Sequence, residues 1–217
     1  MVKTGDGSHT IYNTALNEHY HSVHGAVNES THVFINAGLK EIVTHKKNIS
    51  ILEVGLGTGL NLLLTLSFFQ SNREGLQIGY TALEPFPPGE EFINALNYTR
   101  FFDAAFFQQI HECDFNTQET LLAGFIFEKV NQKLQGIDFI KTFDLIYYDA
   151  FAPLVQPEMW NEDVFKKLFD CLNQDGILVT YCAKGEVKRT LKKVGFKVES
   201  LPGPPGKREM IRARKII

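Results

Sequence analysis

A glycine-rich turn constrains the fold of this chain more than any other feature. Residues 50–54 form an apolar run typical of a buried strand, and an amphipathic stretch over residues 59–70 predicts a helix. Between them lie three glycines at alternate positions, Gly55, Gly57 and Gly59. Glycine is needed where the backbone bends sharply or comes close to a ligand without a Cβ in the way. The order of strand, glycine turn and helix therefore predicts an α/β domain with a ligand site at the turn.

Two classes of cofactor site use such a turn. The dinucleotide fingerprint has a third small residue where this chain has Leu60, because helix and strand must pack closely there. Leu60 disfavours a nicotinamide dehydrogenase, which stays open as an alternative. The pattern is instead E-x-G-x-G-x-G, with Glu53 two residues before the first glycine. This form resembles the first motif of class I S-adenosylmethionine-dependent methyltransferases.

Strand-like runs and amphipathic stretches alternate from residue 50 onward. We expect strands over residues 50–54, 77–83, 107–112, 143–148, 177–182, 196–200 and 209–216. We expect helices over residues 59–70, 89–102, 117–134, 157–172 and 186–194. Such alternation predicts a mostly parallel sheet that helices cover on both faces. The turn residues 203–206, Gly-Pro-Pro-Gly, leave no room for a helix between the last two strands, which should pair as an antiparallel hairpin.

The first 49 residues do not follow this alternation. A helix is expected over residues 31–44. We interpret residues 1–45 as an N-terminal helical extension that packs across the ligand edge of the sheet, and residues 46–217 as the S-adenosylmethionine-dependent methyltransferase domain. The expected fold is therefore α/β and Rossmann-like, a class I methyltransferase with a seven-stranded, mostly parallel sheet, a C-terminal antiparallel hairpin and an N-terminal helical extension.

The cysteines and histidines indicate which redox compartment the protein occupies and whether a metal site is expected. The three cysteines are widely spaced and form no CxxC pair, which is typical of a reducing compartment. Three histidines near the N-terminus lack companion cysteines or carboxylates at ligand spacing, so no metal site is expected. They are His19, His21 and His24. No apolar run is long enough to span a membrane, and we expect a soluble, cytoplasmic protein.

Acidic residues after the strands are the candidate cofactor ligands. In open α/β sheets the ligand lies beyond the carboxyl ends of the strands. Glu84 follows the second strand, where a carboxylate can accept hydrogen bonds from both ribose hydroxyls. Asp114 follows the predicted third strand, where this fold often places an acid on the adenine amino group. The complete candidate set is Glu53, Gly55, Gly57, Thr58, Gly59, Asn61, Glu84 and Asp114.

Asp149 ends the predicted fourth strand and is the candidate catalytic residue. An amine must be neutral to attack the electrophilic sulfonium methyl, so an acceptor that orients its N–H bonds and stabilises the developing positive charge is useful. Phe151, Trp160 and Tyr181 are candidate walls for a flat base, although single aromatic residues more often belong to the core.

Charge is distributed unevenly along the chain. Residues 184–217 carry eleven Lys and Arg against three Glu, whereas the remainder carries 11 basic and 22 acidic residues. A basic end on an acidic body indicates either a polyanionic partner or a solvated, lysine-rich helix beside an edge strand.

Several blocks together resemble a known family, the bacterial methyltransferases that complete 5-methylaminomethyl-2-thiouridine at the tRNA wobble position. The resemblance covers the methyltransferase half of that bifunctional enzyme and runs from Tyr20 to Met210. The blocks are Tyr20-His21-Ser22, Glu29-Ser30-Thr31-His32-Val33-Phe34, the turn at 53–61, Glu84-Pro85-Phe86-Pro87, Asp149-Ala150-Phe151-Ala152-Pro153, Pro157-Glu158-Met159-Trp160 and Lys207-Arg208-Glu209-Met210.

The resemblance implies methyl transfer from S-adenosylmethionine to the exocyclic aminomethyl nitrogen of 5-aminomethyl-2-thiouridine. It places Asp149 at the reacting amine and the candidate acids and glycines at the cofactor. Phosphates of the tRNA anticodon stem-loop would meet a basic set, and the wobble base would be splayed into the pocket. That set is Lys184, Lys188, Arg189, Lys207, Arg208 and Arg212, of which Lys184, Lys207 and Arg208 join Phe151 and Trp160 as candidate substrate-binding residues.

The chain departs from the family in two ways. Family members are often fused to a flavin-dependent oxidase that makes the amine, but this chain ends at Ile217 without a second glycine fingerprint. We therefore expect a separate flavin-dependent oxidase to act upstream. The loop at 203–206 is also more proline-rich than the family pattern. A class I methyltransferase or aminopropyltransferase-like enzyme acting on a small-molecule amine stays open, as does a cofactor-binding protein without catalysis.

Overall fold

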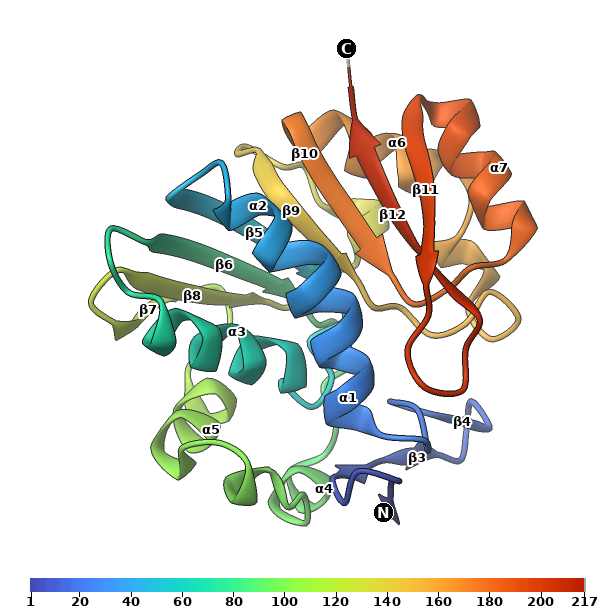
Figure 1. Ribbon diagram of the computed structural model, residues 1–217. Helices are drawn as coiled ribbons and strands as arrows, with labels where there is room; N and C mark the ends of the chain where they lie inside the picture. Colours follow the sequence, from blue (N-terminus) through green and yellow to red (C-terminus); the bar gives the residue numbers. More distant parts are fainter. Residues whose placement is uncertain (217) are drawn as a thin grey trace.

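The computed structural model describes residues 1–216, and Ile217, the last residue of the predicted domain, lies outside the described part. Its centre is an eight-stranded sheet (Figure 1). The strands are β5 (Asn48–Val54), β6 (Gln77–Leu83), β7 (Gln118–Leu122), β8 (Phe125–Val130), β9 (Phe143–Tyr148), β10 (Leu172–Thr180), β11 (Phe196–Pro202) and β12 (Glu209–Lys215). They lie in the order β11-β12-β10-β9-β5-β6-β8-β7.

The strand order confirms the Rossmann-like methyltransferase fold. β5 pairs in parallel with β6 and β9, β6 with β8, and β9 with β10. β12 pairs antiparallel with both β10 and β11, so the predicted C-terminal hairpin is confirmed. The predicted seven strands become eight because β7 pairs antiparallel with β8 at the other edge. The strand order reverses between β5 and β9, which is where ligands bind in sheets of this kind.

Helices cover both faces of the sheet and enclose two apolar cores (Figure 1). One face carries a helix made of α1 (Ala26–Ser30), η1 (Thr31–Leu39) and α2 (Lys40–Val43), together with α3 (Leu60–Ser71), α4 (Glu90–Asn94), η2 (Tyr98–Arg100) and α5 (Ala104–Glu112). The other face carries α6 (Glu162–Cys171) and α7 (Gly185–Val194). Short turns of 3₁₀ helix, η3 (Leu134–Gly136) and η4 (Pro157–Met159), lie in the connections.

The prediction of a strand over 107–112 followed by a helix over 117–134 was wrong. Residues 104–112 form helix α5, because the Asp103 side chain caps it by accepting a hydrogen bond from the backbone N–H of Ala105 (2.8 Å). The following stretch is the β7–β8 hairpin, and Gly124 supplies the positive φ (+88°) that its tight turn needs. The alternation of buried and outward residues in β8 is the strand period that a helical interpretation overlooked.

The single helix expected over 89–102 is broken into α4 and η2. Asn97 lies between them, and its side chain accepts from the backbone N–H of His9 (2.8 Å) and donates to the carbonyl of Gly7 (2.9 Å). This contact ties the break to the N-terminal segment. The helix expected over 157–172 is likewise divided, because Asn161 caps the start of α6 by accepting from the N–H of Val164 (2.9 Å).

The N-terminal segment belongs to the same packed body as the sheet. Two small hairpins, β1 (Val2–Lys3) with β2 (His9–Thr10) and β3 (Tyr12–Asn13) with β4 (Glu18–His19), precede the long helix. The helix starts at Ala26, earlier than the predicted 31–44, and it lies against β9 and β10. Gly38 permits this close approach, since a Cβ there would lie 3.1 Å from Val179. The boundary between residues 45 and 46 stays a prediction.

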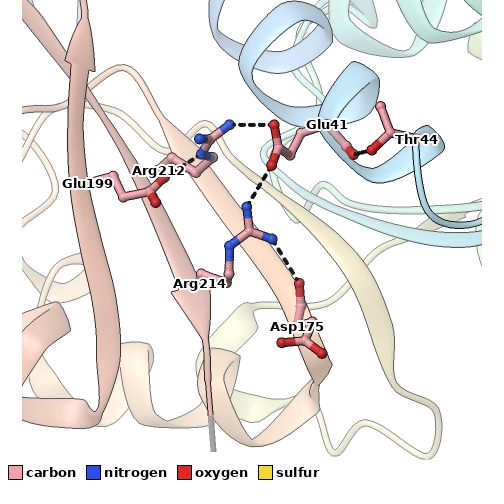
Figure 2. A network of polar contacts seen from close by, with 6 residues as sticks. All are labelled: Glu41, Thr44, Asp175, Glu199, Arg212 and Arg214. Atoms are coloured by element: carbon pink, nitrogen blue, oxygen red, sulfur yellow. Dashed lines mark hydrogen bonds and ion pairs between the residues drawn. The ribbon is translucent and has the colours of Figure 1, made fainter.

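A network of ion pairs joins this helix to the C-terminal strand β12 (Figure 2). Glu41 accepts from Arg212 (3.0 Å) and from Arg214 (2.8 Å), and Arg212 also contacts Glu199 (2.6 Å). Burial raises the pKa of Glu41, but the hydrogen bonds and charges of the two arginines outweigh it and lower the pKa overall. Arg212 was expected to meet a tRNA phosphate. Its side chain is 16% exposed and committed to two carboxylates, so it holds the fold instead.

Candidate active site

A cavity of about 990 Å³ lies at the carboxyl ends of the central parallel strands. Gly55 and Gly57 line it after β5, Glu84 after β6, Asp149 after β9 and Tyr181 after β10. The N-terminal segment around β4 and the loop between β11 and β12 complete the wall, and Figure 1 shows this loop extending toward β4. The cavity therefore lies where the strand order predicts a ligand.

The glycine turn brings bare backbone to the cavity wall. Gly55 has φ +92°, and a Cβ there would lie 2.9 Å from the carbonyl oxygen of Asp149. Gly57 has φ +52°, and a Cβ there would lie 3.1 Å from the ring of Tyr20. Side chains at these two positions would be strained and would crowd the site, so glycine is required for a close approach of backbone to ligand.

Two backbone N–H groups, one of them in the glycine turn, hold the Glu84 carboxylate in place. Its Oε2 accepts from the backbone N–H of Gly57 (2.8 Å), and its Oε1 accepts from the N–H of Phe86 (2.9 Å). Burial raises the pKa of Glu84, and the two N–H groups oppose that rise. Each carboxylate oxygen keeps a further lone pair, which suits a ligand that offers two neighbouring hydroxyls.

A buried amide links two acidic side chains beneath the cavity. Asn61 of α3 donates through Nδ2 to Glu53 Oε1 (2.9 Å) and to Asp149 Oδ2 (2.8 Å). The hydroxyl of Tyr80 donates to the other oxygen of Glu53 (2.8 Å). Glu53 and Asn61 are both buried. Both side chains lie beneath the cavity wall. Glu53 holds Asn61, and Asn61 in turn orients the Asp149 carboxylate.

Asp149 is the acid whose titration matters most for chemistry at neutral pH. Its pKa is raised to about 7, mainly by burial and to a smaller extent by the neighbouring charge of Glu29. The hydrogen bond from Asn61 and the charge of Lys207 oppose this rise. A carboxyl group with a pKa near the working pH can both accept and release a proton.

Two predicted cofactor residues support the turn from within the core. Thr58 is buried and shares a hydrogen bond with the hydroxyl of Tyr98 (3.0 Å). Gly59 precedes α3 in a left-handed conformation. Neither lines the cavity. Their contacts shape the turn and the start of the helix.

Asp114 does not lie where the sequence analysis placed it. It is exposed, it follows helix α5 instead of a strand, and it is not part of the cavity wall. The third parallel strand is β8, and the segment after it contributes Lys133, Leu134 and Gln135 to the wall. The alternating pattern of β8 was the signal that could have located them.

The predicted substrate-binding residues divide into three groups. Phe151 and Lys207 line the cavity. Trp160 is 6% exposed, lies in the core against Tyr148 and donates through Nε1 to the Phe151 carbonyl (2.8 Å). Lys184 and Arg208 lie outside the cavity wall, and Lys188 is paired with Glu209 (2.5 Å). Tyr181, a candidate wall, also lines the cavity, as do Tyr20 and Glu29, to which the sequence analysis gave no role.

We expect Trp160 to act through packing and through its hold on the Phe151 loop. Trp160→Ala should lower the free energy of unfolding by about 3–5 kcal/mol, as is usual for a buried tryptophan. Urea unfolding followed by circular dichroism measures this change. Phe92→Ala, which truncates an exposed ring, is the control and should change stability by less than about 0.5 kcal/mol. Equal losses for the two variants would contradict this role.

His19 and His21, two of the N-terminal histidines, line the cavity. Within residues 1–216, no group of three or more His, Cys, Asp and Glu side chains is placed to hold a metal ion. His21 lines the cavity, and burial lowers its pKa to about 4, so its imidazole is neutral at physiological pH.

No helix of the described chain has the length and apolar character needed to cross a bilayer.

Known proteins share this sequence and architecture. Residues 89–216 match the family described as S-adenosyl-L-methionine-dependent methyltransferase. Two proteins named tRNA 5-methylaminomethyl-2-thiouridine biosynthesis bifunctional protein MnmC, from Azoarcus sp. (strain BH72) and Burkholderia mallei (strain SAVP1), are each 28% identical to this chain. These similarities cover 94% and 97% of this chain but 34% of each relative, so the chain spans about a third of their length. The crystal structure of MNMC2 from Aquifex Aeolicus has a TM-score of 0.80 at 24% identity, covering 98% of this chain and 68% of that one.

A sheet with this strand order and a glycine turn flanked by acids defines a class I methyltransferase. The chain belongs to the S-adenosyl-L-methionine-dependent methyltransferase family, whose match covers more than half of its residues. S-adenosylmethionine is its cofactor, as the sequence analysis predicted.

The cavity fits this cofactor. The bare turn at Gly55 and Gly57 accepts a close ligand, and Glu84 has lone pairs for the two ribose hydroxyls. Asn61 Oδ1 is buried without a hydrogen-bond partner among residues 1–216, and it lies in the layer directly beneath the cavity wall.

Proposed function

We propose that this methyltransferase acts on the exocyclic aminomethyl nitrogen of 5-aminomethyl-2-thiouridine at the wobble position of tRNA. The observation that supports this proposal most strongly is the position of Asp149. This residue lines the cavity beside the glycine turn, and it is the first residue of the D-A-F-A-P block. The names of the two MnmC relatives, which match almost the whole chain, support the choice of substrate. A tRNA substrate would also place the protein in the cytoplasm.

The proposed mechanism assigns one task to each group. S-adenosylmethionine supplies an electrophilic methyl group when it is bound. Asp149 accepts a hydrogen bond from an N–H group of the amine and so directs the nitrogen lone pair at that methyl group. It then takes up the proton released as the new C–N bond forms. Asn61 holds the Asp149 carboxylate through its hydrogen bond (2.8 Å). Because the reactive form is the carboxylate, the rate should fall below about pH 7.

The cofactor is proposed to lie along the glycine turn. Glu84 would accept hydrogen bonds from both ribose hydroxyls, and the backbone atoms of Gly55 and Gly57 would face the cofactor. Glu53 would act through Asn61, since it is buried beneath the wall. Phe151 would face the substrate base from its place in the cavity wall.

The substrate base must leave the anticodon loop to reach a cavity of this kind. RNA bases are read when they are unstacked and splayed out, and phosphates are held by lysine and arginine. We propose Arg208 and Lys184 as phosphate contacts. The relatives are named bifunctional, and we propose that a flavin-dependent oxidase, as the second activity, prepares the amine.

Labelled methyl transfer tests the proposed function. The protein is incubated with S-adenosylmethionine carrying a labelled methyl group and with tRNA that bears 5-aminomethyl-2-thiouridine, and the nucleosides are separated and identified by mass spectrometry. The proposal predicts label in 5-methylaminomethyl-2-thiouridine. Unlabelled tRNA, with transfer to a small-molecule amine under the same conditions, would contradict it and favour the alternative substrate class.

Arg208 should contribute to tRNA binding through charge. Arg208→Glu replaces an exposed cation by an anion, so we expect kcat/KM for tRNA to fall roughly tenfold and its dependence on log salt to weaken by about one unit of slope. Steady-state rates between low and moderate salt measure both effects. Lys166→Glu, a charge reversal on helix α6, is the control and should leave both unchanged. An unaltered salt slope in Arg208→Glu would exclude a phosphate contact.

A further inference from the structure

Three side chains from distant parts of the chain meet in the cavity wall. Lys207, from the loop between β11 and β12, donates through Nζ to Glu29 Oε2 of helix α1 (2.6 Å). The same Nζ lies 4.0 Å from the centre of the Tyr181 ring, within the range of a cation–π contact. The other oxygen of Glu29 accepts from the backbone N–H of Ser22 (3.1 Å). These contacts hold the Lys207 ammonium in one place.

This cluster is tied to the catalytic segment. The hydroxyl of Tyr181 donates to the carbonyl of Ala150 (2.8 Å), the residue directly after Asp149. Glu29, Lys207, Tyr181 and Asp149 all line the same cavity. The ammonium is therefore fixed on the wall that carries the catalytic carboxylate.

Lys207 differs in sign from the other charged groups around Asp149. The titratable groups whose charges interact with Asp149 are Glu29, Glu53, Tyr80, Tyr98, Tyr181 and Lys207. Burial raises the pKa of four of them, which are Glu53, Tyr80, Tyr98 and Tyr181. Within this set of described residues, Lys207 is the one cation.

We infer that Glu29 and Lys207 form a positioning pair that fixes an ammonium group on the cavity wall that carries Asp149 and so sets the pH range in which the catalytic carboxylate works. The inference rests on the role of Asp149 in the proposed function. It also changes the expected role of Lys207, which is a part of the catalytic wall instead of a contact to tRNA phosphate.

The two partners should act in opposite directions. The ammonium of Lys207 favours the charged form of Asp149, and the carboxylate of Glu29 disfavours it. Lys207→Met should therefore move the acidic limb of the pH–rate profile upward by roughly one pH unit, and Glu29→Gln should move it downward. The double variant removes both charges, so its limb should return toward that of the unaltered protein.

The pH dependence of kcat for methyl transfer to tRNA measures these shifts in the full chain. Lys193→Met removes a lysine from the Lys193–Glu162 pair, away from the cavity, and should leave the profile in place. Lower rates with an unmoved limb in both variants would mean that the pair is structural, and shifts in the same direction would also overturn the inference.

A titration without substrate separates this inference from the proposed function. The chain is labelled with ¹³C-carboxyl aspartate, the Asp149 resonance is assigned by its loss in Asp149→Asn, and its midpoint is followed in each variant. Opposite shifts support the pair even if tRNA is not the substrate. Unchanged midpoints in both variants overturn the inference even if tRNA is methylated.

Discussion

Replacing Asp149 by asparagine is expected to slow methyl transfer by roughly 10²- to 10⁴-fold, the usual contribution of a positioned acid or base. Asparagine keeps the shape of the side chain and can still accept from Asn61 Nδ2 (2.8 Å in the native chain). It cannot take up the proton of the attacking amine. Single-turnover rates with saturating cofactor measure the loss, and isothermal titration should show that the affinity for S-adenosylmethionine changes little.

The same variant should be more stable at high pH. The pKa of Asp149 is raised from 3.8 to about 7 in the folded chain, so folding favours the protonated acid. Stability from this group is present at low pH and is lost as pH rises from about 4 through 7, because ionisation then opposes burial. Asp149→Asn removes that opposition above pH 7. Asp138→Asn, an exposed control, should change neither rate nor stability, and an Asp149→Asn enzyme of normal rate would refute the catalytic assignment.

Loss of the Glu84 carboxylate is expected to weaken cofactor binding about a hundredfold. Glu84→Ala removes two charge-assisted contacts to the ligand, together worth about 3 kcal/mol, and it frees the N–H groups of Gly57 and Phe86 that shape the turn. Isothermal titration with S-adenosylmethionine measures the dissociation constant. Circular dichroism checks that the variant is folded.

Two further variants make this result specific. Glu84→Gln keeps the size of the side chain and one acceptor oxygen, so its loss of affinity should be smaller. Glu90→Ala removes an exposed carboxylate from α4 and should bind the cofactor normally. A folded Glu84→Ala protein with native affinity would show that the ribose lies elsewhere.

The parts of the fold that sequence alone could predict are those where one period dominates. β9 is buried along its whole length, as parallel strands covered on both faces are, and its predicted bounds match. The α5 and β7–β8 region was misassigned because short runs rich in phenylalanine suit both periods. There the Asp103 cap and the turn at Gly124 decide the outcome.

The candidate site could be predicted as far as it depends on the strand ends. Gly55, Gly57, Glu84 and Asp149 were located by their places after β5, β6 and β9, and all four line the cavity. Glu29 and Tyr20 were given no role in the site, because their distances from it are set by how the N-terminal segment folds back over the sheet. Long-range packing of this kind leaves no local spacing to detect.

The basic C-terminal region has several separate tasks. Arg212 and Arg214 bind Glu41 and hold the long helix against β12 (Figure 2). Lys207 faces the cavity. Arg208 and Lys184 stay outside the wall, where a large anionic substrate could reach them. Net charge along the sequence therefore overstated the number of cations available to a partner.

A crystal structure with S-adenosylhomocysteine, the stable product of the cofactor, would show directly whether Glu84 binds the ribose and Asp149 lies at the reacting centre. We expect the ribose hydroxyls to lie on the Glu84 carboxylate and the sulfur to face Asp149 across the cavity. An empty cavity in crystals soaked at saturating concentration, or a ligand whose sulfur points away from Asp149, would contradict this expectation.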